Sequence, residues 1–325
     1  MKIILTALML IALAVCCSPE ILSHQPVLVG ATPVCEQSNR RTITLTAETQ
    51  AGAPANNLRP EDLSITENGT SLEVLDLALK TNDPLAVAIL IDTSVSQERT
   101  LSQTRTAALQ FLETLLPTAK HRAAVISFTG QPTVEEQLTN DATKLRAALA
   151  RVKVLLPTGY VRGGLVVGPI PRHRRVAGTT AIWDAVWTTT EMLKAERNAR
   201  AVIILLTDGE DTSSDKSLRD AVEHAARYDA SVFAIGIADK SYGGPNRSNL
   251  NKLSEETGGR AFFPKDNEAL NAALRQIDQE IRGRYLLTYC GPGSNTAKRL
   301  PKVKITLKGP QAKSDLRLLY RHYGL

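Results

Sequence analysis

The sequence predicts an α/β fold: a doubly wound, mostly parallel sheet flanked by helices and inserted in a small β-sandwich. Short aliphatic runs, of which residues 85–91 are the first, are apolar on both faces, as strands buried in a parallel sheet are. Segments with helical spacing of their apolar residues alternate with these runs. Alternating β patterns occupy both ends of the chain, before residue 80 and after residue 282. Together these observations define the fold class.

The N-terminal β segment, residues 41–82, consists of short alternating runs separated by turn-forming residues. The runs cover residues 42–47, 63–66 and 72–77, and Asn68-Gly69 lies between the last two. This dipeptide between two alternating runs is a strong signal for a two-residue hairpin. We therefore expect a small antiparallel unit here.

The central segment, residues 83–282, has the pattern of a parallel sheet with crossover helices. We expect strands at 85–91, 123–128, 201–206, 231–237 and 261–263, and helices at 100–116, 141–152, 181–196, 217–228, 250–257 and 267–282. Right-handed crossovers between such strands give a doubly wound, Rossmann-like sheet. Ligands of such sheets bind beyond the carboxyl ends of the strands, so the residues that follow each run are the informative ones.

The C-terminal β segment, residues 283–325, has strand-like runs at 285–289, 303–307 and 316–320. Neither this segment nor residues 41–82 has enough strands for a stable core of its own. We therefore predict that both join in one β-sandwich, with residues 83–282 inserted between them.

The N-terminus has the pattern of an export signal. Lys2 precedes an apolar run, residues 3–15, that is too short for a comfortable membrane span. We expect residues 1–17 to be a signal peptide and 18–40 to be a tether, so that the protein is secreted, periplasmic or lipid-anchored at the cell envelope. Leu13-Ala14-Val15-Cys16 is similar to a bacterial lipobox, which makes Cys16 a candidate lipidation site. Cleavage of the signal peptide near Ala14 without lipidation agrees equally well with the sequence.

The composition bears on the class of partner. The net charge of +6 and the isoelectric point of about 9.1 favour acidic partners or membrane surfaces. Aromatic residues make up 4% of the chain, and no dense Lys/Arg run is interleaved with them, so we expect no nucleic-acid binding. Of the cysteines, only Cys35 and Cys290 lie in the folded body. They are a candidate disulfide in an exported protein, and two unrelated buried thiols are the alternative.

Polar side chains follow two of the buried runs. Asp92, Ser94 and Ser96 come after the first run, Asp208 follows residues 201–206, and Thr180 directly precedes the helix expected at 181–196. This set contains carboxylates and hydroxyls but no thiol or imidazole. Oxygen-only ligands suit hard cations such as Mg²⁺, Mn²⁺ or Ca²⁺ and argue against zinc. Mg²⁺ is the expected ion.

These residues resemble the metal-ion-dependent adhesion site of von Willebrand factor A domains. Asp92, Ser94 and Ser96 match its Asp-x-Ser-x-Ser motif, Thr180 stands at the place of its threonine, and Asp208 matches its final aspartate. The resemblance covers residues 83–282, and the flanking segments are similar to those of exported bacterial VWFA-related proteins. It implies that the hydroxyls contact the metal, that the aspartates act mainly through water and hydrogen bonds, and that an open metal position accepts an Asp or Glu of a protein partner.

Two charged segments lie near these residues in the sequence. The long loop at 159–177 contains basic residues that could form a rim selecting acidic partners, and a solvated insertion is the simpler reading. The rim candidates are Arg162, Arg172, Arg174 and Arg175. Glu210, Asp211 and Asp215 could form a second cation site, although such clusters are more often solvated loop or helix-start charge.

The motifs favour a binding function over catalysis. A haloacid-dehalogenase-type phosphatase would need an acid at the position of Ser94, two residues after Asp92. The sequence contains no nucleophile elbow, P-loop or dinucleotide-binding glycine pattern. We therefore expect a non-enzymatic, divalent-cation-dependent protein-binding or adhesion module outside the cytoplasm. The alternatives are a structural or assembly factor of the cell envelope without obligatory metal-mediated binding and, more remotely, a metal-assisted hydrolase.

Overall fold

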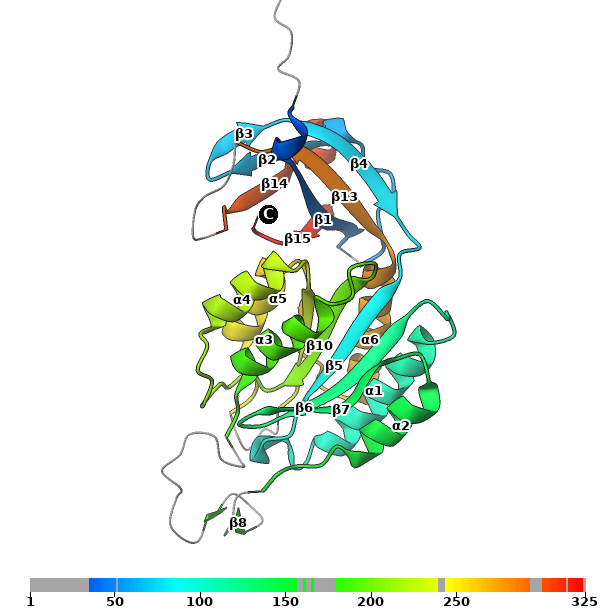
Figure 1. Cartoon of the computed structure of the whole chain (residues 1–325), viewed down its shortest axis with the longest axis vertical. Coiled ribbons are helices and arrows are strands. Elements are labelled where there is room, and N and C mark those ends of the chain that lie inside the picture. Colours follow the sequence, from blue (N-terminus) through cyan, green and yellow to red (C-terminus); the bar gives the residue numbers. More distant parts are fainter. Residues whose placement is uncertain are drawn as a thin grey trace, which may run out of the picture. The chain divides into compact units, whose positions relative to one another are not determined.

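The computed structural model describes residues 35–50, 52–156, 160–161, 165–166, 179–238, 243–292, 300–313 and 315–323. Its six-stranded central sheet has the strand order β12-β11-β10-β5-β6-β7 (Figure 1). The strands are β5 (Leu85–Asp92), β6 (Arg122–Phe128), β7 (Pro132–Thr139), β10 (Arg200–Thr207), β11 (Ser231–Gly236) and β12 (Ala261–Phe262). All are parallel except β7. β5 is the first strand of this sheet in the sequence, and the later strands lie on both sides of it. The sheet is therefore doubly wound, as predicted.

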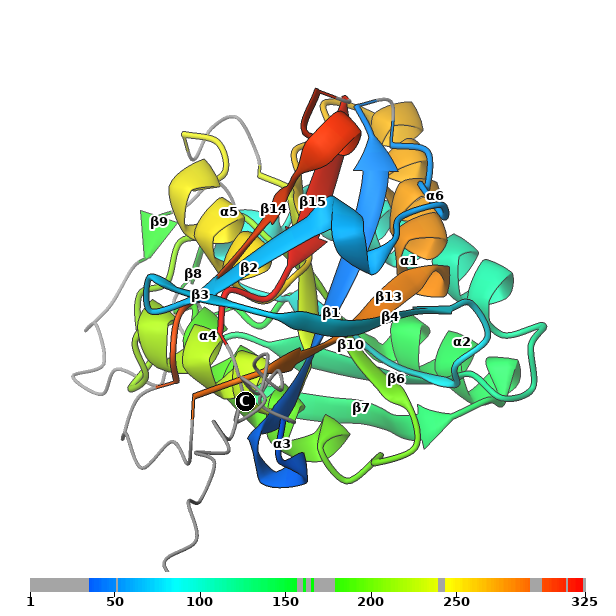
Figure 2. The same cartoon turned by 90° about the horizontal axis from the view of Figure 1, so that it is seen from above.

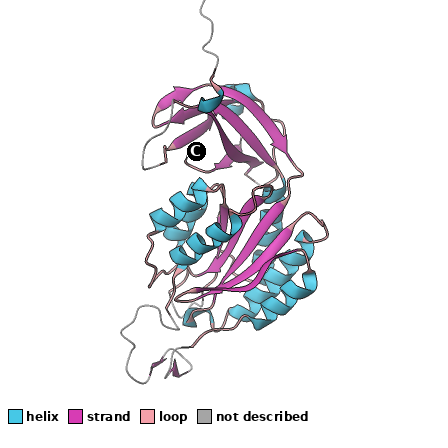
Figure 3. Cartoon of the chain, viewed as in Figure 1, coloured by secondary structure: helices cyan, strands magenta, loops and turns pink. Residues whose placement is uncertain are grey.

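Helices cover both faces of this sheet, as Figure 3 shows. On one face lie α1 (Leu101–Leu115), α2 (Ala142–Arg151) and α6 (Asn267–Arg282); on the other lie α3 (Ile182–Leu193), α4 (Leu218–Arg227) and α5 (Arg247–Glu256). Alternate residues of β5 point to opposite faces, so that Val87 and Ile89 enter one core while Ala88 and Leu90 enter the other. Burial on both faces explains why these strands are aliphatic throughout.

The N- and C-terminal segments together form a two-sheet β-sandwich, which confirms the predicted fold class. One sheet has the order β15-β1-β13-β4 and the other has the order β14-β2-β3. Figure 2 shows strands from both ends of the chain lying side by side, with β1 in blue next to β15 in red. The strands are β1 (Arg40–Thr49), β2 (Leu63–Glu67), β3 (Thr70–Leu72), β4 (Val74–Lys80), β13 (Arg284–Cys290), β14 (Val303–Leu307) and β15 (Leu316–Tyr320).

The sandwich core draws on both segments: Ile43, Leu45, Leu63 and Ile65 come from the first, and Tyr285, Leu287, Tyr289, Val303 and Ile305 from the second. The predicted hairpin joins β2 and β3. Its turn residues, Asn68 (φ 49°) and Gly69 (φ 86°), both have the positive φ that a two-residue hairpin turn requires.

Several elements differ from the prediction. Residues 72–77 do not form one strand, because the chain leaves the smaller sheet after Leu72 and joins the larger sheet at Val74. The edge strand β7 was not predicted. Its residues lie half exposed or exposed at the sheet margin, so they lack the apolar run that marks the central strands. The short strands β8 (Tyr160–Val161) and β9 (Leu165–Val166) pair with each other only.

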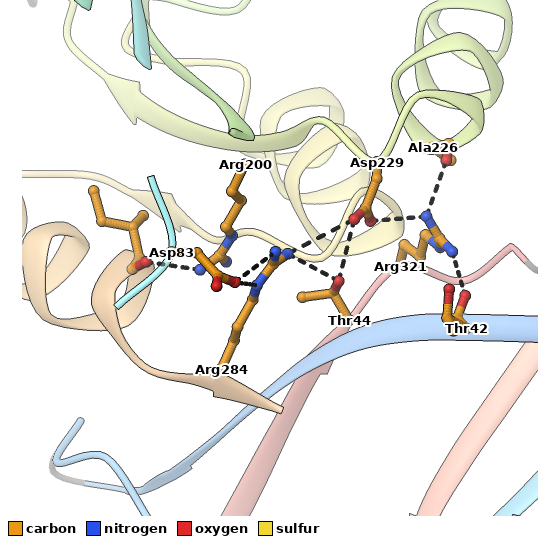
Figure 4. A network of polar contacts seen from close by, with 9 residues as sticks. Thr42, Thr44, Asp83, Arg200, Ala226, Asp229, Arg284 and Arg321 are labelled. Carbon is orange, nitrogen blue, oxygen red and sulfur yellow. Dashed lines mark hydrogen bonds and ion pairs between the residues drawn. The ribbon is translucent and has the colours of Figure 1, made fainter. Parts of the chain in front are cut away.

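A polar network joins the sandwich to the inserted α/β domain (Figure 4). Arg284, the first residue of β13, donates from Nη2 to Asp83 Oδ2 (3.1 Å) and from Nη1 to Thr44 Oγ1 (3.0 Å). Arg321, which is almost fully buried, donates from Nη1 to Asp229 Oδ1 over 2.7 Å. Asp229 follows α4, so this contact fixes that helix end to the sandwich. The two parts of residues 36–325 therefore pack as one compact unit.

The same junction contains a buried arginine at the start of β10. Arg200 is 5% exposed and donates from Nη1 to the carbonyl of Ile281 at the end of α6 (2.7 Å). Burial, and secondarily the nearby Arg284, lower its pKa to about 9. Close by, Arg260 forms ion pairs with Glu48 of β1 and Glu280 of α6. The junction therefore holds α6 and the amino end of β10 together.

Several predictions concern residues outside the described ranges, among them the signal peptide, the Cys16 lipidation site and most of the tether. Cys35 and Cys290 are both disulfide-bonded. Within the described ranges, none of the helices has the length and apolar character that crossing a membrane requires.

Candidate metal centre

The candidate site lies where β5 and β10 end. These strands are parallel neighbours, with Ile91 opposite Leu206, so the residues that follow them come out at the same edge of the sheet. Asp92 is the last residue of β5, and Asp208 directly follows β10. As the sequence predicted, two carboxylates distant in the chain lie together.

The motif residues form a hydrogen-bonded chain. The Ser94 amide donates to Asp92 Oδ1 (2.9 Å), which closes the turn after β5. The hydroxyl oxygens of Ser94 and Ser96 lie 3.0 Å apart, and the Ser96 hydroxyl donates to Asp208 Oδ2 over 2.5 Å. Side-chain oxygens from two loops therefore line one small polar site.

Thr207, the last residue of β10, also belongs to the site, although it was not among the predicted residues. Its hydroxyl donates to Asp92 Oδ2 (2.6 Å) and accepts from the Gly209 amide (3.1 Å). Gly209 has φ +84°, and a Cβ there would lie 2.8 Å from Leu250 Cγ, so the tight turn after Asp208 requires glycine. The sequence offered one indication of this role, namely that Thr207 carries a hydroxyl and directly precedes Asp208.

The backbone of Thr180 is held between the loops that follow β6 and β10. The Ala181 amide donates to the Thr129 carbonyl in the loop after β6 (2.8 Å), and the Thr212 amide in the loop after β10 donates to the Thr180 carbonyl (2.8 Å). Thr180 is 6% exposed. Among the described residues, no hydrogen bond joins its hydroxyl to the other predicted ligands.

The electrostatics of the site favour a cation. Asp92 is 1% exposed and Asp208 is 5% exposed, and no ion pair links either to a described Lys or Arg. Burial, followed by the negative charge of Asp208, raises the pKa of Asp92 to about 7. Two adjacent buried carboxylates that accept only from neutral donors among the described residues suit a compensating positive charge.

The donor set also fits a hard metal ion. The side chains of the five predicted ligands offer a metal oxygen atoms only, and hydroxyl, carboxylate and water oxygens are the ligands of Mg²⁺, Mn²⁺ and Ca²⁺. The described ranges contain no group of three or more Cys, His, Asp or Glu side chains arranged to hold a metal. A cation here would therefore depend on the serine and threonine hydroxyls.

Comparison with protein families agrees with this architecture. One model of the von Willebrand factor type A domain matches residues 87–210 and a second matches residues 171–278. The chain contains a von Willebrand factor type A (VWA) domain. The matched residues extend from β5 into α6, and so include both loops that carry the acidic residues of the site.

Three proteins of known sequence or structure are similar to part of this chain. Mouse integrin alpha-M is 27% identical over 88 residues, which are 27% of this chain and 8% of the integrin. A von Willebrand factor type A structure from Catenulispora acidiphila has a TM-score of 0.50 at 16% identity, covering 84% of this chain and 71% of that one. Proximal thread matrix protein 1 from the mussel byssus, with a zinc-occupied MIDAS motif, has a TM-score of 0.48 at 16% identity, covering 64% and 49%. At such identity, structural likeness shows the fold alone.

Other predicted residues of the VWA domain have different placements. The rim candidates Arg162, Arg172, Arg174 and Arg175 lie outside the described residues. Asp211, considered for a second cation site, instead caps the amino end of α3. Its Oδ2 accepts from the amides of Ile182 (2.8 Å) and Trp183 (3.2 Å), which agrees with the helix-start reading.

Proposed function

We propose that this chain is a binding module outside the cytoplasm whose VWA domain captures a partner protein through a divalent cation. Asp92, Ser94, Ser96, Thr180 and Asp208 would hold the cation. The observation that carries the proposal is the buried Asp92–Asp208 pair, to which no described cationic side chain is paired.

The residues suggest how a partner would be held. A cation bound largely by neutral hydroxyls keeps much of its positive charge, because few carboxylates contact it directly. Such an ion attracts one further anionic oxygen, and an exposed Asp or Glu of a partner supplies it. We propose Mg²⁺ as the resident ion, with Mn²⁺ and Ca²⁺ as alternatives. Export to the cell envelope or beyond, with or without a lipid anchor at Cys16, is part of the same proposal.

One observation favours a second function, that of a structural or assembly factor at the cell envelope. The loops of the site are joined directly by hydrogen bonds between their own side chains, Ser96–Asp208 and Thr207–Asp92. In this alternative the cation would only reinforce the loops, and the partner would bind elsewhere.

We propose no catalytic step. Of the described histidines, His121 accepts from the Leu85 amide at the opposite end of β5, His224 stacks on Trp187 of α3, and His322 follows β15. None of them has a hydrogen bond to the site, so a hydrolase would lack an imidazole base among the described residues.

Calorimetric titration with Mg²⁺ and Mn²⁺ tests the metal site. Wild type should bind one ion, Asp92→Ala and Asp208→Ala should not, and Asp76→Ala is the matched control because Asp76 is exposed on β4. The variants should keep their fold, because aliphatic strands build the sheet.

Capture from an envelope extract tests partner binding. The immobilised protein should retain a partner in Mg²⁺ and release it in EDTA, and Asp208→Ala should retain none. Capture that is indifferent to EDTA and to this substitution would favour the structural alternative.

A further inference from the structure

Gln97 is a buried polar residue at the metal centre that the Asp-x-Ser-x-Ser motif does not include. It is the last residue of the 3-10 turn η3 (Val95–Gln97) and is 2% exposed. Its Nε2 lies 3.3 Å from Asp208 Oδ2 and 3.3 Å from the carbonyl oxygen of Ile237, and donates to both. One amide group therefore links the loop after β5 with the loops after β10 and β11.

The orientation of this amide is fixed from its other side. The Thr100 hydroxyl donates to Gln97 Oε1 over 2.8 Å, which leaves the NH₂ group to face Asp208. The backbone amide of Gln97 donates to the Ser94 carbonyl (3.0 Å), so its main chain is held by the motif turn itself. Both the side-chain amide and the backbone of Gln97 are thus held by hydrogen bonds.

The donors to Asp208 show why this matters. Asp208 Oδ2 accepts from Ser96 and Gln97, and Oδ1 accepts from the Glu210 amide (3.1 Å). Ser96 is itself a proposed metal ligand, so its hydroxyl has two roles. Among the described residues, Gln97 is the one side-chain donor to Asp208 that is not a proposed ligand. The side chain of Gln97 is also neutral. It therefore orients the Asp208 carboxylate and leaves its negative charge available to a cation, whereas a Lys or Arg would neutralise that charge.

We propose that Gln97 is a positioning residue of the metal centre, which holds Asp208 in place before a cation binds. Residues that orient metal-site side chains through hydrogen bonds contribute to metal affinity because the site then needs no rearrangement on binding. The inference rests on the proposed metal site, and its structural basis is the pair of hydrogen bonds from Gln97 to Asp208 and Ile237.

The first test measures Mn²⁺ affinity without any partner, by electron paramagnetic resonance of the free ion. Gln97→Met keeps the side-chain length and removes the donor, and should weaken Mn²⁺ binding about tenfold. Thr100→Val removes the hydroxyl that orients the Gln97 amide, and it should weaken Mn²⁺ binding by a smaller factor. Thr106→Val is the matched control, because the Thr106 hydroxyl bonds only within α1 and should leave the affinity unchanged. Mn²⁺ binding as tight as wild type in Gln97→Met would overturn the proposal, and if that variant does not fold, Thr100→Val decides in the same way.

The second test needs no metal. In amide ¹H–¹⁵N spectra of the metal-free protein, the Gln97 side-chain NH₂ signal should move in Asp208→Asn and in Thr100→Val, and should stay in Asp76→Ala. If the chemical shifts of the Gln97 side-chain NH₂ group were the same in Asp208→Asn as in wild type, the positioning role would be refuted. If wild type bound no Mn²⁺, the proposed function would fail, whereas this spectrum would still decide whether Gln97 orients Asp208.

Discussion

The hydroxyl of Ser96 donates a 2.5 Å hydrogen bond to Asp208, a residue 112 positions further along the chain. This contact brings together the two loops that follow β5 and β10. It also places a neutral donor, and not a cation, against one of two adjacent buried carboxylates. The predictions that concern the site follow from this arrangement.

A divalent cation should stabilise the protein strongly. At a Mg²⁺ concentration of about 100 times Kd, binding to the folded state alone contributes about 2.7 kcal/mol. For a domain of this size we expect Tm to rise by about 5–10 °C, measured by circular dichroism. Asp208→Ala should remove the rise, whereas Asp76→Ala should keep it. An equal rise in Asp208→Ala would place the stabilising ion elsewhere.

Loss of Arg284 should loosen the junction between sandwich and VWA domain. Arg284→Ala leaves Asp83 and Thr44 without their donor, and we expect a loss of about 2 kcal/mol in the free energy of unfolding. Arg219→Ala is the control, because its solvent-exposed ion pair with Glu223 lies within α4 and contributes little to stability. Urea denaturation measures both, and equal losses would mean that the junction adds no stability.

His224 should make the protein less stable in mild acid. It is stacked on Trp187, with ring centroids 3.6 Å apart, and faces Glu191 and Lys194. Burial lowers its pKa, and the attraction of Glu191 opposes this effect. A histidine with a lowered pKa binds fewer protons when folded than when unfolded. Its stability contribution is therefore complete above the unfolded pKa of about 6.5 and is lost as the pH falls toward the folded pKa.

The variant His224→Phe keeps the ring stacking but cannot take up a proton. Between about pH 7 and pH 5, its Tm should fall less steeply than that of wild type. Every other titrating group is common to both proteins, so the difference between the curves isolates His224. Parallel curves would contradict the prediction.

The disulfide should contribute to the stability of the sandwich. Cys35 and Cys290 are both disulfide-bonded, and we predict that they are bonded to each other. A non-reduced peptide map should contain the two linked peptides, and reduction should cost about 2–5 kcal/mol. Reductant should not change the Tm of a variant that carries serine at both positions. Free thiols at Cys35 and Cys290 would reject the pairing.

The sequence was sufficient to predict the central strands and to bring Ser96 and Asp208 together at the end of the sheet. A strand such as β5 is buried on both faces, so its aliphatic run identifies it directly. The carboxyl ends of parallel strands lie at the same edge of a sheet. Asp92 at the end of β5 and Asp208 after β10 therefore lie at one edge. The hairpin at Asn68-Gly69 was predictable because its backbone conformation suits few residues.

Features that depend on tertiary contacts were not predictable. Nothing local distinguishes Gln97 from a surface glutamine, since its partners Asp208 and Ile237 lie more than 100 residues away. Strand β7 combines exposed and half-exposed residues, and its pairing with β6 is visible only in the folded sheet. The division between β3 and β4 arises because the chain passes from one sheet of the sandwich to the other, with no change in the alternating pattern.

The register of β1 and β13 has a mechanical consequence. The two strands are antiparallel, with Arg40 opposite Cys290 and Leu45 opposite Tyr285. The VWA domain joins β13 at its amino end, next to Arg284. If the chain is held at the amino end of β1 while a partner pulls on the VWA domain, the two strands are drawn in opposite directions along their length. If Cys35 and Cys290 are bonded to each other, as predicted above, the disulfide carries this load from the start of β1 into the end of β13. In the reduced protein the load would instead fall in shear on all the hydrogen bonds of the ladder at once.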